Sequence, residues 1–471
     1  MDGVKRVLAG IFLLALAAAA VYGYMASERE RTSRQHLAAG DIALAQDNTS
    51  AAIEEFSGAI TLKPDSMIGY LKRGQTYRKR GEFVAAIRDL RKAAELDPSA
   101  TRPLEELGDA YLADTPHRYS AAADRYAAYV KLDNRAPRVL YKLAFARYSD
   151  RHVAEAIEAL HTAIAQDDRF AEAYYLLGLC ERDAQHPGAA RTALEHSITL
   201  QPTLLHAREQ LADLYGTAGR TEPRLEQLKA LTALDPRPAR EVALGLEYAR
   251  TGQPELAVLT LGRATERYPE YPYAYVALGR VWLEIAQARD DRVALSKALG
   301  ALEAAVGSDN SSEALTLFGR ALLLTPDAET AERILQEATE KRPADRLAFF
   351  YLADAAERLG HWPVARRALL DYAALRGDET DSRRRAAEAA RLGDLSLRMN
   401  QPAVAATYFL RAADDSSSDA ALLARAADAQ SRAGDVDTAR VTITNALAKD
   451  PTNTVALAVA RRLIPARRPG A

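Results

Sequence analysis

The sequence has almost no cysteine, since Cys180 is the only one among 471 residues. A single thiol excludes an intrachain disulfide, a CxxC redox pair and a cysteine-based zinc site. Cys180 stands beside Gly178 and Leu179 in an apolar stretch with helical periodicity, which favours a packed small side chain over a reactive nucleophile. The number of cysteines therefore does not indicate the cellular compartment in which the protein resides.

An excess of charge of one sign is also lacking. The chain carries 62 Lys and Arg against 64 Asp and Glu, for a formal net charge of -2, and the two signs alternate throughout. Nucleic-acid-binding domains usually carry a basic excess or a basic stripe, so we expect no nucleic-acid partner. Short arginine clusters at 383–385 and at 461, 462, 467 and 468 are interpreted as solvated surface, and the alternative for each is a docking patch.

The common catalytic and metal-binding motifs are absent from the sequence as well. Its eight histidines include no pair spaced i, i+4 and no HExxH helix, which a helical zinc site would need. It contains no GxxxxGK[ST] loop for phosphates and no GxSxG turn for a nucleophilic serine. We therefore predict no enzymatic activity, no catalytic residues, no metal site and no cofactor.

One long uncharged run is present near the start of the chain. Residues 7–27 read VLAGIFLLALAAAAVYGYMAS, which is about the length that crosses a bilayer as a helix. Tyr22 and Tyr24 near its end suit the lipid headgroup layer. The alternative is a signal sequence that is cleaved after the small residues at 18–20. We predict a transmembrane anchor at 7–27, between a short tail at 1–6 and a linker at 28–32.

The charges that flank this run favour one orientation. Lys5 and Arg6 precede it, and a short basic tail before a single span usually stays in the cytoplasm. Arg29, Arg31 and Arg34 on the other flank reduce that bias. We predict a single-pass protein of the inner (cytoplasmic) membrane whose body is periplasmic or otherwise extracytoplasmic.

The rest of the chain repeats itself about every 34 residues. A small residue is followed by a second small residue, a large apolar one, a third small one and a proline, at offsets of 12, 16, 19 and 24. The pattern reads Gly74, Ala86, Leu90, Ala93, Pro98 in one copy and Gly40, Ala52, Phe56, Ala59, Pro64 in the copy before it. The first small residues of the twelve copies are Gly40, Gly74, Gly108, Ala144, Gly178, Ala212, Gly245, Gly279, Gly319, Ala353, Gly393 and Ala427.

Pairs of closely packed helices explain this spacing. A small residue on the first helix lets the second helix approach, and the large residue fills the groove between them. Proline then ends the second helix. In five units a glycine lies between the two helices, where a left-handed helix cap is favoured. These glycines are Gly81, Gly219, Gly252, Gly360 and Gly434.

The pattern resembles the tetratricopeptide repeat, a helix-turn-helix unit of 34 residues, and the resemblance covers nearly all of residues 33–452. It implies an all-α fold, a right-handed superhelical solenoid of about twelve repeats in which each unit buries its faces against its neighbours. Residues 453–464 have the pattern of a capping helix, and we expect 465–471 to be disordered. Irregular stretches at 285–297 and 373–385 predict subdomain boundaries or, for the first, longer helices.

In this family the first helix of each unit lines a concave groove, so the resemblance implies a set of partner-binding residues. Aromatic side chains beside arginines are typical of peptide-binding hot spots. The alternative is that some of these rings pack between units. The predicted groove residues are Arg138, Tyr141, Phe145, Tyr148, Tyr175, Leu179, Arg182, Gln75, Arg78, Glu105, Asp109, Glu209 and Asp213.

One well-known variant of that groove is not matched. Some family members hold a C-terminal carboxylate with a clamp of Lys, Asn, Asn, Lys and Arg across three units. Arg138 and Lys142 match the last pair, but the earlier positions are Leu71, Gln75 and Glu106. Since Glu106 would repel a carboxylate, we predict a generic groove and reject a chaperone-tail receptor.

These features together favour a membrane-anchored scaffold or assembly factor that binds partner proteins in its groove. The Ala- and Arg-rich composition is typical of bacteria, which suggests an envelope complex such as secretion, polysaccharide export or pilus biogenesis. One alternative is a carbohydrate- or small-ligand-binding module in which Tyr141, Tyr148 and Tyr175 stack on sugar rings. Another is a non-catalytic accessory subunit of an enzyme.

Overall fold

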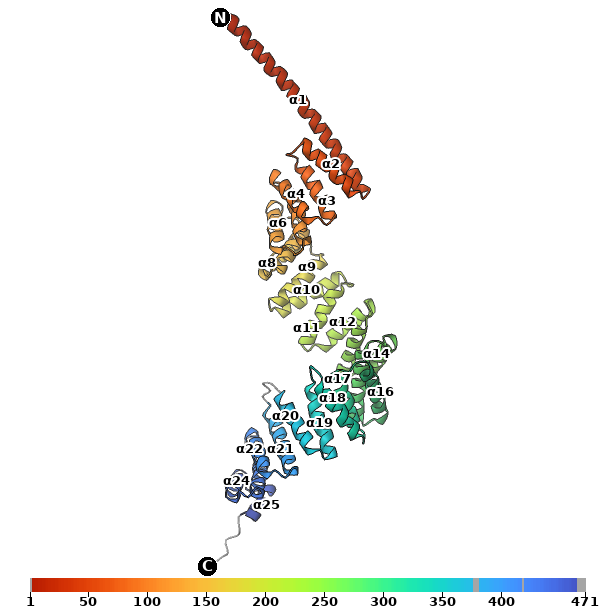
Figure 1. The fold of residues 1–471 in the computed structure, drawn as a ribbon, viewed down its shortest axis with the longest axis vertical. Coiled ribbons are helices and arrows are strands. Elements are labelled where there is room, and N and C mark those ends of the chain that lie inside the picture. Colours follow the sequence, from red (N-terminus) through yellow and green to blue (C-terminus); the bar gives the residue numbers. More distant parts are fainter. Residues whose placement is uncertain (1, 376–380, 417–418, 464–471) are drawn as a thin grey trace, which may run out of the picture. The chain divides into compact units, whose positions relative to one another are not determined.

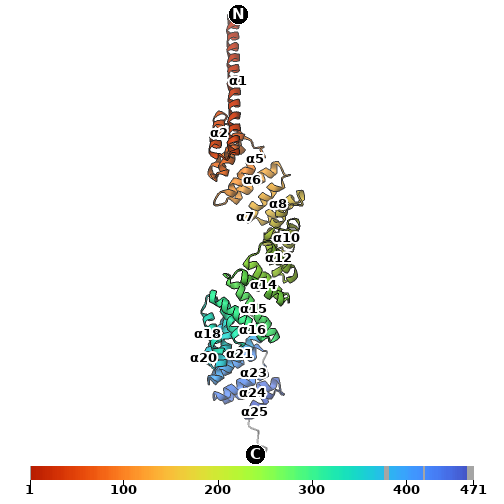
Figure 2. The same cartoon turned by 90° about the vertical axis from the view of Figure 1, so that its right-hand side faces the viewer.

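The computed structural model describes residues 2–375, 381–416 and 419–463, and all regular secondary structure in these ranges is α-helical. The chain divides into two compact units, Met1–Ala230 and Leu231–Ala471. Within each unit consecutive helices lie side by side as antiparallel neighbours (Figures 1 and 2). The all-α fold predicted from the sequence is confirmed.

The helices of the first unit are α1 (Asp2–Ala45), α2 (Thr49–Leu62), α3 (Met67–Lys79), α4 (Phe83–Leu96), α5 (Thr101–Ala113), α6 (Tyr119–Leu132), α7 (Pro137–Ser149), α8 (Val153–Gln166), α9 (Ala171–Asp183), α10 (Pro187–Leu200) and α11 (Leu205–Thr217). Helix α12 (Thr221–Leu234) spans the boundary between the units. The helices of the second unit are α13 (Pro238–Arg250), α14 (Pro254–Arg267), α15 (Pro272–Arg289), α16 (Arg292–Ser308), α17 (Ser312–Leu322), α18 (Ala328–Glu340), α19 (Arg346–Leu359), α20 (Trp362–Ala374), α21 (Ser382–Arg398), α22 (Pro402–Asp415), α23 (Ala420–Arg432), α24 (Val436–Lys449) and α25 (Thr454–Leu463).

In the described part of the chain, α1 to α24 follow one another in the order of twelve pairs, and α25 comes after the last of them. This agrees with the predicted count of about twelve repeats and one capping helix. The prolines act as expected, since α4 ends at Leu96 two residues before Pro98. The intervening Asp97 has φ -137° and ψ 89°, the extended conformation that a following proline favours.

The packing rule behind the repeat is visible where the two helices of a pair cross. A Cβ atom added to Gly319 would lie 2.4 Å from Cγ of Leu335, and one added to Gly178 would lie 2.5 Å from Cγ of Leu194. Both leucines are fully buried. Each large side chain therefore occupies the space that a glycine leaves open. The same arrangement occurs at Gly40, Gly74, Gly108, Gly245, Gly279 and Gly393.

The turns within the pairs also follow the prediction. All five glycines expected in the left-handed region have positive φ, from 66° at Gly219 to 91° at Gly434. Other pairs place a non-glycine residue in this conformation, as at Arg151 with φ 67° and Gln185 with φ 63°. Glycine is thus the usual residue at the turn position with positive φ. Arg151 and Gln185 show that the fold also tolerates the backbone strain of a residue with a side chain there.

Helix α1 joins the apolar run to the first repeat without a break. Residues 28–32, expected as a linker, are helical. Thr32 donates its hydroxyl to the carbonyl of Glu28 at 2.9 Å, and Arg34 pairs with Glu30 at 3.0 Å. The segment Gly10–Ala45 is the only described helix long and apolar enough to cross a membrane. Its apolar end projects free of the other helices (Figures 1 and 2).

The irregular stretches have different outcomes. At 285–297 the helices are longer, because α15 has 18 residues and α16 has 17. The alternative of helix extension therefore describes this insertion. The stretch 373–385 lies partly outside the described residues, and so does the end of the expected capping segment, residue 464. The tail 465–471 lies entirely outside them.

Candidate functional site

The predicted groove residues lie on the first helices of five successive pairs, α3, α5, α7, α9 and α11, all in the first unit. Helix α3 contacts α5, and α7 contacts α9. These helices therefore present neighbouring faces, as a groove requires. The polar side chains among the predicted residues are largely used to tie one repeat to the next.

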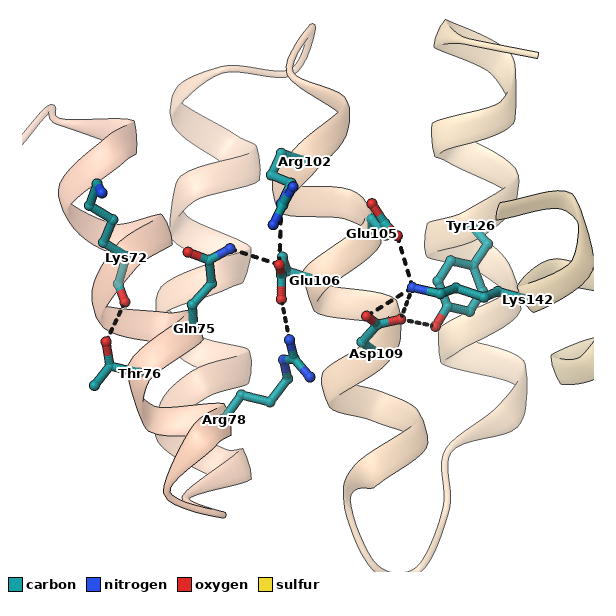
Figure 3. Close-up of polar contacts among 10 residues, drawn as sticks. All are labelled: Lys72, Gln75, Thr76, Arg78, Arg102, Glu105, Glu106, Asp109, Tyr126 and Lys142. Carbon is teal, nitrogen blue, oxygen red and sulfur yellow. Dashed lines mark hydrogen bonds and ion pairs between the residues drawn. The ribbon is translucent and has the colours of Figure 1, made fainter. Parts of the chain in front are cut away.

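Glu106 is the centre of the first tie (Figure 3). Glu106 as a residue is 5% exposed, and its carboxylate accepts hydrogen bonds from Gln75 Nε2 and Arg78 Nη2 on α3, both at 2.7 Å. Arg102 Nε adds a third at 3.2 Å. The carboxylate that would repel an acidic ligand is thus neutralised by its own neighbours. Gln75 and Arg78 are held between repeats.

Lys142 is the centre of the second tie, which joins α7 to α5 and α6 (Figure 3). Its ammonium group lies 2.8 Å from Glu105 and 2.8 Å from Asp109, and the Tyr126 hydroxyl donates to Asp109 at 2.7 Å. Burial opposes the charge on Lys142, but the hydrogen bonds to Asp109 and Glu105 outweigh it and raise the pKa of Lys142. Burial and the neighbouring carboxylates also raise the pKa of Tyr126. Glu105 and Asp109 are therefore already paired.

A third tie crosses α7, α9 and α11. The Tyr148 hydroxyl donates to Asp183 at 2.7 Å, Arg182 donates to the same carboxylate at 2.8 Å, and Arg182 also donates to Gln210. Burial and the bond to Asp183 raise the pKa of Tyr148 to about 12. Burial acts against ionisation of Asp183, but the bonds from Tyr148 and Arg182 lower its pKa overall.

The apolar side chains of the predicted groove differ in their surroundings. Tyr141, Tyr148 and Leu179 are half-buried and pack against the core of the first unit. Tyr175 packs against a smaller cluster around Tyr215. Phe145 is the most open of the rings, at 39% exposed. Most of these rings are therefore partly packed against the core. This is closer to the alternative given above, rings packed between repeats, than to rings that line an open groove.

The last two predicted residues lie on α11. Asp213 is exposed, and Glu209 is half-buried and has an interaction partner in the structure. Both lie one helix beyond the rings and arginines of α7 and α9 in the order of first helices.

The structure gathers a different set of side chains around the start of α7. A hollow of about 600 Å³ is lined by Arg138 and Tyr141 from α7, by Arg169 and Phe170 from the turn before α9, and by Leu200 at the end of α10. The rings of Tyr141 and Phe170 lie 5.2 Å apart, centroid to centroid. The side chains of Arg138 and Arg169 are exposed, and neither has a hydrogen-bond or ion-pair partner among the described residues.

Sequence reasoning found Arg138 and Tyr141 but missed Arg169 and Phe170. The predicted positions were all on first helices, whereas Arg169 and Phe170 stand in the turn between two pairs. An aromatic residue next to an arginine just before a predicted helix was the available signal. Within the described ranges, no three side chains of His, Cys, Asp or Glu converge in the manner of a metal site.

Cys180, on α9, belongs to the core of the first unit and is fully buried. Burial raises the pKa of its thiol to about 12, with smaller contributions from Asp183 and Glu181. We expect the native protein to resist a thiol reagent such as dithionitrobenzoate at pH 8, because little thiolate forms there and the sulfur is covered. Denaturation in guanidinium should release one reactive thiol per chain. Rapid labelling of the native protein would contradict this placement.

The sequence is similar to a family model and to two known proteins. The model of the tetratricopeptide repeat family matches residues 37–101, 141–203 and 242–313. The small glutamine-rich tetratricopeptide repeat-containing protein 2 of Mycosarcoma maydis is 30% identical over 101 residues, which are 21% of this chain and 28% of that relative. Tetratricopeptide repeat protein 13 of Homo sapiens is 29% identical over 135 residues, which are 29% of this chain and 15% of that relative. The chain therefore spans less than a third of the length of either relative.

Solved structures resemble parts of the chain. The crystal structure of MamA is 27% identical and covers 36% of this chain and 96% of its own, with a TM-score of 0.34. YrrB, described as a protein with an unusual peptide-binding site, is 21% identical and covers 40% of this chain and 96% of its own, with a TM-score of 0.36. A chain from the Naa15/Naa10 complex bound to HypK-THB is 14% identical and covers 93% of this chain and 70% of its own, with a TM-score of 0.36.

Proposed function

Because the chain is a tetratricopeptide repeat protein, we propose that it is a protein-interaction scaffold whose partner docks in the hollow at the start of α7. One observation carries the proposal: two unpaired guanidinium groups and an apolar surface share one hollow of about 600 Å³. Apolar area gives affinity, and a few placed polar groups give orientation, which is the usual composition of a binding hollow. Arginine and tyrosine are also the residue types that dominate binding energy at interfaces.

The charges around the hollow define the segment that fits it. Lys142 is neutralised by its two carboxylate partners, and Asp167 accepts the backbone N–H of Arg169 at 3.1 Å. Arg138 and Arg169 thus remain available, opposed by the exposed Glu172. The matching partner is an extended segment with an Asp or Glu beside an aromatic or leucine side chain. The carboxylate would meet the arginines, and the apolar side chain would lie on the rings.

We also propose that α1 holds this scaffold at a membrane. The support is the length and apolar composition of Gly10–Ala45 and the exposure of every large apolar side chain from Leu8 to Met25. Lys5 and Arg6 favour an extracytoplasmic body. The scaffold would then serve a complex of the bacterial envelope, such as secretion, polysaccharide export or pilus biogenesis.

Charge reversal in the hollow tests the docking proposal. Random short peptides displayed on phage are selected against the full chain in detergent, and the enriched peptides are measured by fluorescence anisotropy. We expect them to share an acidic residue beside an apolar one. The double variant Arg138→Glu, Arg169→Glu should bind them at least about tenfold more weakly, because each charge-assisted bond contributes about 1.5–3 kcal/mol.

A matched control is the exposed Lys131 on α6, which does not line the hollow. Lys131→Glu changes the net charge in the same direction and should leave peptide binding within a factor of about two. Because Lys131→Glu changes the net charge by half as much as the double variant, a control loss of about half the double variant's loss in binding free energy would mean that only overall charge matters. Enriched peptides that bind the double variant normally would place the partner elsewhere and overturn the proposal.

A further inference from the structure

The first repeat begins almost where the uncharged run of α1 ends. The hydroxyl of Ser33, which is 2% exposed, donates to the carbonyl of Ala59 on α2 at 3.1 Å. Lys63, the residue after α2, places Nζ 2.5 Å from a carboxylate oxygen of Glu30. The end of α2 and the turn at 63–66 are therefore fixed beside residues 30–33 of α1.

The connection between the run and the repeat is stiff. Residues 2–45 form one helix without proline, and the residues between the run and the repeat are helical. Glu30 pairs on one side with Arg34 on its own helix and on the other with Lys63. Because α2 and the turn at 63–66 pack against this single helix, their orientation relative to α1 is fixed.

Simple lengths place this turn relative to a bilayer. At about 1.5 Å per residue, the helix rises about 4.5 Å from Ser27 to Glu30 and about 9 Å to Ser33. The uncharged run 7–27 is about 31 Å long by the same measure, close to the roughly 30 Å of a hydrocarbon core. The headgroup layer adds roughly 5–8 Å on each side. The turn at 63–66 thus falls at headgroup level when the run spans the bilayer.

The side chains at that turn suit lipid headgroups. Met67 and Ile68 are the first residues of α3, and Ile68 is 49% exposed. The Ser66 hydroxyl accepts the backbone N–H of Gly69 at 3.2 Å, which holds the start of α3 in place. An exposed apolar side chain next to the end of an apolar helix is the composition of an interfacial contact, in which the apolar group inserts beside the headgroups. The ammonium of Lys63 is already paired with Glu30, and Asp65 in the same turn is exposed, so the contact depends on Ile68 and not on charge.

We propose that the junction of the first two repeats, formed by the turn at 63–66 and the side chain of Ile68 at the start of α3, rests directly on the bilayer, with lipid headgroups as its partner. This inference rests on the proposed anchoring by α1. It implies that α1 is a rigid mount and that the first repeat keeps one orientation to the membrane. A flexible tether would let the repeat leave the surface.

A single-site fluorescent label tests the contact. Because Cys180 is buried, an added cysteine can be labelled with an environment-sensitive dye such as NBD in the folded full chain. The chain is reconstituted in phosphatidylethanolamine and phosphatidylglycerol vesicles that carry a headgroup spin-label quencher. We expect Ile68→Cys to lose most of its NBD emission on adding the quencher lipid and to emit further to the blue than in detergent.

Ile42 is the matched control, since it is 61% exposed on α1 in the neighbouring first repeat and lies about 22 Å beyond Ser27 at the helical rise. Ile42→Cys should keep its emission. A label at Leu16→Cys, inside the run, reports insertion and should be quenched by acyl-chain spin labels. If Leu16 is quenched and Ile68 is not, the contact is wrong while the anchor stands. If Leu16 is not quenched, the anchor fails as well.

A second variant tests whether the contact of the turn with lipid depends on the unbroken helix α1. A glycine- and serine-rich segment inserted between Ser27 and Glu28 breaks the helix and adds reach without touching the turn. The Ile68 label should then recover most of its emission. If quenching persists, the turn binds lipid without help from α1, and the rigid mount is overturned.

Discussion

Replacement of Asp89 by alanine is expected to lower the free energy of unfolding by about 3–5 kcal/mol, the usual effect of removing one partner from a buried ion pair. Asp89 is 1% exposed, and its two oxygens accept Arg73 Nε at 2.6 Å and Nη2 at 3.1 Å. The Arg73 side chain is 15% exposed, and its other partner is the Ser57 hydroxyl at 3.0 Å. Without the carboxylate, a charged guanidinium stays buried with no counter-ion.

Arg73 cannot escape this penalty by losing its proton. Burial opposes its charge, but the hydrogen bond and attraction to Asp89 outweigh that effect and raise the pKa of Arg73. Asp89→Ala removes that support, but a guanidinium group stays protonated in proteins, so Arg73 remains charged in the variant. Replacing both residues, as in Arg73→Met with Asp89→Leu, should recover much of the lost stability because no buried unpaired charge remains. Arg88, which also pairs with Asp89 at 3.2 Å, has a side chain that is 67% exposed and stays solvated.

A matched control lies on the same helix, α4. Glu95 pairs with Lys92 at 3.4 Å, and the two side chains are 57% and 47% exposed. Glu95→Ala should change stability by no more than about 0.5 kcal/mol, as exposed pairs do. Urea unfolding followed by circular dichroism at 222 nm measures both variants. Equal effects at the two sites would show that the Arg73–Asp89 pair is not buried as described.

Replacement of Gly319 by alanine should destabilise the second unit by about 2 kcal/mol. The added Cβ would lie 2.4 Å from Cγ and 2.6 Å from Cδ2 of Leu335. Leu335 is fully buried in an apolar cluster, so any shift of its side chain would disturb close-packed neighbours. Overpacking of this kind costs about 3 kcal/mol at the upper end of its usual range, and the better helix propensity of alanine returns about 1 kcal/mol.

Gly300 on α16 is the control, because it is exposed and an added Cβ would meet nothing within 4 Å. Gly300→Ala should stabilise the same unit by up to about 1 kcal/mol, so the two identical substitutions are expected to have opposite signs. Urea unfolding monitored by circular dichroism reports both. A stabilising Gly319→Ala would mean that the two helices are not as close as the structure has them.

Of the two contacts that these experiments test, only one could be predicted from the sequence. The contact between Gly319 and Leu335 was predicted from residue type and spacing alone, because a helix converts sequence offsets into facing positions. The pairing of Arg73 with Asp89 was not predicted, although both residues are plain in the sequence. Many carboxylates lie near each arginine along the chain, and only folding selects one.

The candidate site shows the same division. Arg138 and Tyr141 were predicted from their positions on a first helix, and the structure places both in the hollow. Arg169 and Phe170 were missed because they belong to the turn before the next repeat. Glu106 was read as a charge facing a ligand, but it is held by side chains from α3.

The sequence by itself determined the all-α class, the repeat count, the sites of close helix contact and the left-handed turns. Each of these depends on the size and backbone freedom of residues at fixed spacing, and a helix makes that spacing local. Only the tertiary structure decided which polar groups pair between repeats, which turns border the hollow and how α1 enters the first repeat. Those outcomes depend on side chains brought together by stacking, and stacking distances are not encoded in any local pattern.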